Sequence, residues 1–122
     1  MGTTDNPRPA EDFVHILLAS HQVVAACAAE PDLGGPDAVA LAKAGDTARF
    51  VDWFNEWRCR NHEVVSVIRV ANPAYSDFDI CIHRSGPLYW IHIDEFDDIC
   101  YFASERDASA YARREFSDYI DD

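Results

Sequence analysis

Residues 78–93 read FDICIHRSGPLYWIHI and form two runs in which apolar and polar side chains alternate. A period of two is typical of strands that bury one face, and the Gly-Pro pair between the runs is a turn signal. We therefore predict two antiparallel strands, at residues 78–83 and 88–93, joined by a turn at residues 84–87. In the simplest register His83 faces Leu88, and all four isoleucines of the hairpin lie on one face.

Two neighbouring stretches extend this hairpin to a predicted four-stranded antiparallel meander. Residues 64–70 are rich in β-branched side chains, and residues 99–103 follow a short acidic turn. Short connections favour antiparallel neighbours. One face of this sheet is uniformly apolar and needs helices to cover it. The opposite face is half apolar and is predicted to carry Asp79, Cys81, His83, Leu88, Trp90, His92, Cys100 and Phe102.

The sequence before the strands has helical spacing. Apolar residues recur at intervals of three and four within residues 9–29, which predicts one helix. A second helix is predicted at residues 37–44 and is closed by Gly45. Asp46 is a candidate N-cap for a third helix. Four aromatic residues of that helix share one face, which we interpret as core: Phe50, Trp53, Phe54 and Trp57.

The sequence after the strands predicts one more helix, over residues 106–119. Ser104 and Asp107 precede it in the spacing of a capping box. The expected fold is therefore α+β, with N-terminal helices, a four-stranded antiparallel meander and a C-terminal helix. Residues 1–8 are expected to be a flexible leader, and residues 9–122 a single domain.

The chain is strongly acidic. It carries 22 Asp and Glu residues against 10 Lys and Arg, a net charge of −12. Residues 77–122 hold 12 of these acids against 4 arginines, which makes their net charge −8. Such a field repels nucleic acid and anionic membranes and speeds encounter with basic partners. An apolar fraction of 48% argues against disorder.

The four cysteines, Cys27, Cys59, Cys81 and Cys100, are widely spaced and form no CxxC pair. We interpret them as free and mostly buried thiols of a cytoplasmic protein. No apolar run reaches the about 18 residues that a membrane span needs. The apolar stretch before Cys27 is interrupted by polar residues and lacks a basic leader, which favours a helix over a secretory signal.

Residues suited to metal binding or catalysis occur without a decisive motif. Cys59 and His62 have the types and spacing of zinc ligands. Four more candidates share the half-apolar sheet face: Cys81, His83, His92 and Cys100. Asp79 is expected opposite His92, where a carboxylate orients an imidazole in catalytic triads. Because the ligand spacing is loose and no nucleophile elbow is present, we expect no enzyme, no metal and no cofactor.

An acidic turn surrounds a single aromatic residue, Phe96. The acids of the turn are Asp94, Glu95, Asp97 and Asp98, and Glu105 and Asp107 follow shortly after. The calcium-loop pattern of alternating acids and a glycine is absent. Two interpretations stay open: a solvated turn, or a contact patch in which Phe96 is the apolar anchor.

In its size, its acidity and its lack of a catalytic motif, the chain resembles bacterial immunity proteins and phage-encoded inhibitors in general character. We expect a non-catalytic protein that masks the basic surface of a nuclease or nucleic-acid-binding complex, without binding nucleic acid or membrane itself. The expected contacts are Asp94, Glu95, Phe96, Asp97, Asp98, Glu105 and Asp107. One alternative is a homo-oligomeric structural or regulatory module that uses the sheet face with Asp79, Trp90, His92 and Phe102. The other is a small Cys/His metal protein.

Overall fold

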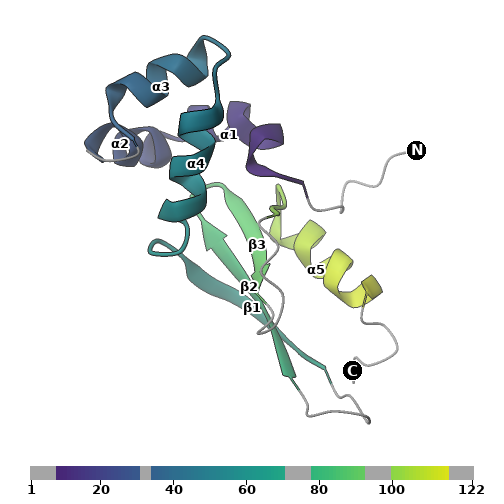
Figure 1. Ribbon diagram of the computed structural model, residues 1–122. Helices are drawn as coiled ribbons and strands as arrows, with labels where there is room; N and C mark the ends of the chain where they lie inside the picture. Colours follow the sequence, from purple (N-terminus) through teal and green to yellow (C-terminus); the bar gives the residue numbers. More distant parts are fainter. Residues whose placement is uncertain (1–7, 31–33, 71–77, 93–99, 116–122) are drawn as a thin grey trace. The chain divides into compact units, whose positions relative to one another are not determined.

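The computed structural model describes residues 8–30, 34–70, 78–92 and 100–115 (Figure 1). These residues contain helices and an antiparallel sheet, which confirms the α+β class. The chain divides into two compact units. The helical unit consists of the described residues within Pro9–His62 and Ser85–Pro87, and the sheet unit of those within Met1–Arg8, Glu63–Arg84 and Leu88–Asp122. The expected single domain over residues 9–122 stays a prediction.

The helical unit contains a 3-10 turn, η1 (Ala10–Phe13), and four helices: α1 (Val14–Ala19), α2 (His21–Ala29), α3 (Pro36–Lys43) and α4 (Ala48–Trp57). The prediction of one continuous helix over residues 9–29 was wrong. Ser20 has extended backbone angles, φ −86° and ψ 114°, and separates α1 from α2. The Ser20 hydroxyl accepts a hydrogen bond from the Val23 N–H at 3.3 Å, so this residue starts a new helix instead of continuing the old one.

The end of α3 explains why Asp46 is not an N-cap. Gly45 adopts a left-handed conformation, with φ +105°, and its N–H donates to the Ala42 carbonyl. The N–H of Asp46 donates to the Leu41 carbonyl at 2.9 Å. These two bonds form a Schellman motif, in which both residues close α3. The next helix, α4, therefore has Thr47 at its N-cap, without a side-chain hydrogen bond.

The aromatic face of α4 is core, as predicted. Phe50 and Phe54 are fully buried, and Trp53 and Trp57 are nearly so. Trp53 stacks on Phe50 and on Trp57, with ring centroids 5.9 and 5.4 Å apart. The side chains that face the other way along α4 are exposed and polar, among them Asp52 and Glu56. This amphipathic pattern anchors α4 in the helical unit.

The sheet unit contains three strands, β1 (Glu63–Val70), β2 (Phe78–Ser85) and β3 (Leu88–His92), in the order β1-β2-β3. The prediction of a fourth strand at residues 99–103 was wrong. Within the described part of that segment, Tyr101 and Phe102 make isolated bridges to two different partners, Arg8 and Tyr89. Because the pairing passes from one partner to the other after a single residue, no ladder forms.

The hairpin is tighter than predicted. β2 continues to Ser85, so the connection to β3 shrinks to Gly86 and Pro87. Gly86 has φ +59°, a conformation that favours glycine in such turns. The ring of His83 stacks on Trp90, which corrects the predicted pairing of His83 with Leu88 by two residues. A shift of two leaves every side chain on its predicted face.

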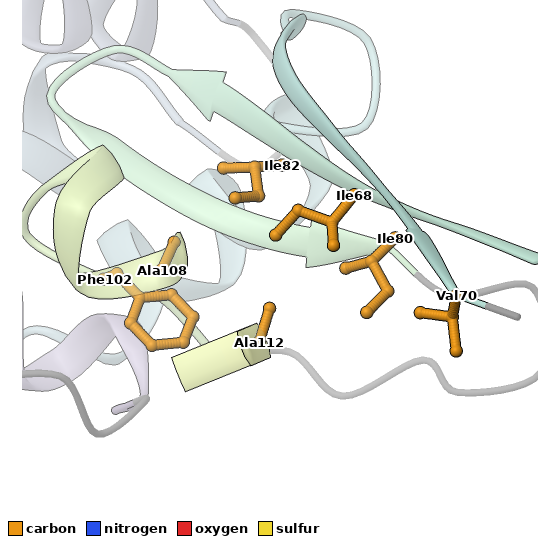
Figure 2. Packing of buried hydrophobic residues seen from close by; sticks show 7 residues of the cluster. All are labelled: Ile68, Val70, Ile80, Ile82, Phe102, Ala108 and Ala112. Carbon is orange, nitrogen blue, oxygen red and sulfur yellow. The ribbon is translucent and has the colours of Figure 1, made fainter. Parts of the chain in front are cut away.

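Helix α5 (Glu105–Glu115) covers the apolar face of the sheet (Figures 1 and 2). Ala108 and Ala112 are the buried residues of α5, and their small side chains allow close packing. Together they contact a buried cluster from the strands and the preceding segment: Ile68, Val70, Ile80, Ile82 and Phe102. The predicted helix also included residues 116–119, which lie outside the described residues.

Phe102 corrects one further prediction. It was expected on the half-apolar face, but it belongs to the core beneath α5, where its ring lies 5.4 Å from that of Tyr111. The reason is its register: Phe102 pairs with Tyr89, whereas the prediction paired Tyr89 with residue 103. A slip of one residue moves a side chain to the other face of a sheet.

Candidate functional site

The strand register defines the face of the sheet opposite α5. Paired residues of an antiparallel ladder lie on the same face, and Val64 pairs with His83, Val67 with Cys81, and Arg69 with Asp79. The stacking of His83 on Trp90 adds β3 to the same face. We call this surface the open face, and its described members are Val64, Val67, Arg69, Asp79, Cys81, His83, Leu88, Trp90 and His92.

A β-bulge decides which residues of β1 reach the open face. The register shifts between Val64 and Ser66, so Val65 is the extra residue of β1. Without the bulge, Val64 and Val67 would lie on opposite faces, because they are three residues apart. With it, both valines lie on the open face, and Val65 packs against the core.

Val64 and Val67 are exposed apolar side chains. Their exposed fractions are 52% and 55%, although neighbouring Ile68 and Val70 are buried. Beside them, the Arg69 Nε lies 3.4 Å from the Asp79 carboxylate, and both side chains are well exposed. The open face therefore combines two uncovered valines with one surface ion pair.

The other half of the open face is aromatic. His83 and Trp90 are buried, and their rings are nearly parallel with centroids 4.3 Å apart. His92 is exposed, and its ring meets both of theirs edge-on, at centroid distances of 6.0 Å from His83 and 6.5 Å from Trp90. Offset and edge-on arrangements of this kind are favourable for aromatic rings. The cluster is well suited to stiffening the sheet.

The predicted second interface is only partly assembled by the structure. Asp79, Trp90 and His92 share the open face. Phe102 is absent from it, because it lies in the core with an exposed fraction of 2%. Trp90 itself is 7% exposed, so it offers little surface to a partner. Asp79 forms its ion pair with Arg69 of β1, opposite it in the register.

The four thiols differ in solvent exposure more than the sequence indicated. None of the four forms a disulfide, but only Cys27 is buried; Cys81 and Cys100 are half-buried and Cys59 is exposed, so the expectation of mostly buried thiols was wrong. Burial raises the pKa of Cys27 from 9.0 to about 11, against the opposing effects of Arg49 and a hydrogen bond to Gly35. A thiol with so little thiolate is a poor nucleophile.

The metal alternative depends on Cys59, His62 and the Cys and His side chains of the sheet. Cys59 and His62 are both exposed at the end of the helical unit. Across the ranges that the structure describes, no three His, Cys, Asp or Glu side chains lie together in a way that could hold a metal ion.

The predicted acidic contact patch lies mostly beyond the described ranges. Asp94, Glu95, Phe96, Asp97 and Asp98 fall outside the described residues. Glu105 and Asp107 are described, in the first turn of α5. Glu105 is exposed, whereas Asp107 is half-buried and its N–H donates to the Ser104 hydroxyl at 3.0 Å. Of these two carboxylates, Glu105 is therefore the better placed to meet a partner.

Two residues that the sequence analysis overlooked are Val64 and Val67. β1 contains two pairs of adjacent apolar residues, Val64-Val65 and Val67-Ile68, which interrupt the alternation of the strand. Such a pair is compatible with a bulge, but the sequence does not say at which of the two pairs the bulge lies.

No protein family model, curated protein or solved structure matches this chain. Within the described residues no single helix is long and apolar enough to cross a membrane; the pair Ala10–Ala19 and His21–Ala29 reaches that length together but is bent by 99°.

Proposed function

We propose that this protein is a non-catalytic inhibitor that masks the basic, nucleic-acid-handling surface of another protein. The observation that carries the proposal is the charge: a net of −12, with −8 in residues 77–122 alone. A nuclease or a nucleic-acid-binding complex holds phosphates with Lys and Arg side chains. Carboxylates that occupy those side chains block the target without any chemical step.

The contact surface centres on the acidic turn. Asp94, Glu95, Asp97 and Asp98 supply the attraction that speeds encounter, and Phe96 supplies an apolar anchor. Exposed Glu105 at the start of α5 extends the surface. This assignment fits a toxin-immunity protein and a phage anti-defence inhibitor, such as an anti-CRISPR protein, equally well, because both would act as nucleic-acid mimics.

The test is a pull-down from the native host at low and high salt, followed by association kinetics with the captured protein. The variant Asp94→Asn/Glu95→Gln/Asp97→Asn/Asp98→Asn removes four charges from the turn. A matched control removes four exposed charges from the helical unit: Glu11→Gln, Asp46→Asn, Asp52→Asn and Glu56→Gln.

The proposal predicts that the wild type and the control capture a basic partner at low salt, and that the turn variant associates at least about tenfold more slowly. If the turn variant and the wild type associate at the same rate at low salt, the assignment of the turn is wrong. If neither the wild type nor the control captures a basic protein, the inhibitor proposal fails.

A further inference from the structure

The open face combines three properties that suit contact with another protein surface. Two of its valines, Val64 and Val67, are more than half exposed. Among the described residues the only other large apolar side chain with comparable exposure is Leu41, in the helical unit. Two exposed valines on one strand face form a small apolar patch, which marks an interaction site more often than isolated apolar residues do.

The charges beside the patch indicate the partner. Arg69 and Asp79 are opposite charges on the same face, at paired positions of β1 and β2. The described residues of the open face therefore have no net charge, although the chain as a whole carries −12. Two copies of this chain repel each other through their net charge, and the described residues of the open face add no net charge to that repulsion.

An arrangement with two-fold symmetry uses the same residues. In an isologous contact both copies use the same surface. If one residue of the first copy meets a second residue of the other copy, the same contact occurs again with the two copies exchanged. Val67 would lie near the symmetry axis, and Arg69 of each copy would meet Asp79 of the other. The ion pair within each chain is exposed, so exchanging its partner costs little.

We propose that the open face is the interface of a homodimer, with Val64 and Val67 at its centre and Arg69–Asp79 pairs exchanged between the copies. The proposed interface uses no residue of the acidic segment at residues 94–98, so the proposal does not depend on the inhibitor function, and the protein would be a bivalent inhibitor if both proposals hold. It differs from an interface around Trp90 and Phe102, because those side chains are buried.

The oligomeric state of the full chain tests the proposal directly. Sedimentation velocity from micromolar to millimolar concentration should show a monomer–dimer equilibrium for the wild type. Because apolar contact dominates while the net charges repel, added salt should strengthen the dimer. Salt has the opposite effect on capture of a basic partner, so the two proposals can fail separately.

Reversing the charge of Arg69 or of Asp79 tests the ion pairs between the two copies directly. Arg69→Asp makes the charged pair wholly acidic, and Asp79→Arg makes it wholly basic, so each variant alone should dimerise at least about tenfold more weakly. An equimolar mixture of the two should form a mixed dimer, which native mass spectrometry identifies by its mass. A structural defect would not be repaired by mixing.

Val67→Lys should also weaken the dimer, whereas Leu41→Lys, an equivalent change on α3, should leave it unchanged. Circular dichroism confirms that each variant is folded. The proposal is overturned if the wild type stays monomeric at every concentration and salt level. It is equally overturned if the Val67→Lys and charge-reversal variants dimerise as tightly as the wild type.

Discussion

The imidazole ring of His83 lies against the indole ring of Trp90, with centroids 4.3 Å apart and an angle of 17° between the planes. The two residues come from adjacent strands, and both are buried. The contact therefore joins β2 to β3 through side chains as well as through backbone hydrogen bonds.

Removing this contact should destabilise the fold, and the contributions of the two rings to stability should be coupled. Trp90→Ala is expected to lower the free energy of unfolding by about 3–5 kcal/mol. A double-mutant cycle with His83→Ala should give a coupling energy of about 0.5–1.5 kcal/mol, measured by urea denaturation with circular dichroism. A cycle between Trp90→Ala and Ser104→Ala is the control and should be additive. A His83–Trp90 coupling of zero would show that the stacked rings do not stabilise each other.

The thiols should react in an order set by exposure and pKa. Exposed Cys59 should react with iodoacetamide first, and buried Cys27, with its pKa raised to about 11, only as the chain unfolds. Peptide mass spectrometry over a time course in mildly alkaline buffer gives the order. Cys59→Ser should remove the fastest phase. Early modification of Cys27 in the folded protein would contradict its burial.

The raised pKa of Cys27 also predicts a pH dependence of stability. Below pH 9.0 this thiol is protonated in the folded and the unfolded chain, so its contribution is constant. As the pH rises from 9.0 to about 11, the unfolded chain loses the proton first, and stability falls. Cys27→Ala should lose stability less steeply over this range than the wild type, as measured by urea titrations at several pH values. Parallel curves would rule out a raised pKa.

The start of α5 offers a local test of helix capping. Ser104→Ala removes the hydroxyl that accepts from the Asp107 N–H, and should lower the free energy of unfolding by about 1 kcal/mol. Ser104→Asp should retain most of the stability, because aspartate also caps helices. Ser109→Ala makes the same chemical change inside α5 and should not destabilise. Equal effects of the two alanine substitutions would argue against a capping role for Ser104.

Much of the fold follows from local patterns. The aromatic face of α4, the strand β1 and the cap at Ser104 were predictable because each depends on residues close together in sequence. The faces of the β2–β3 hairpin were predictable for the same reason, since an error of two residues in register leaves them unchanged.

The features that the sequence did not predict depend on competition between interactions. Ser20 fits the helical pattern by position, but its hydroxyl caps α2 instead. Asp46 is a good N-cap by type, but its N–H is used to close α3. The partners of Tyr101 and Phe102 lie far away in sequence, at Arg8 and Tyr89, and no local signal specifies them. The two exposed valines of the open face were missed because a single bulge in β1 decides which of its residues reach that face.

The hairpin turn belongs to the helical unit, although its strands belong to the sheet unit. The Ser85 hydroxyl donates to the Arg58 carbonyl at 3.3 Å, and a Cβ added to Gly86 would lie 2.7 Å from a methyl group of Val23. The helices are therefore synthesised well before the turn that completes their packing. A ribosome-bound chain that ends before Ser85 holds every helix of this unit and still lacks part of its core. We expect the growing chain to acquire protease resistance in its helical unit only after Pro87 has left the exit tunnel.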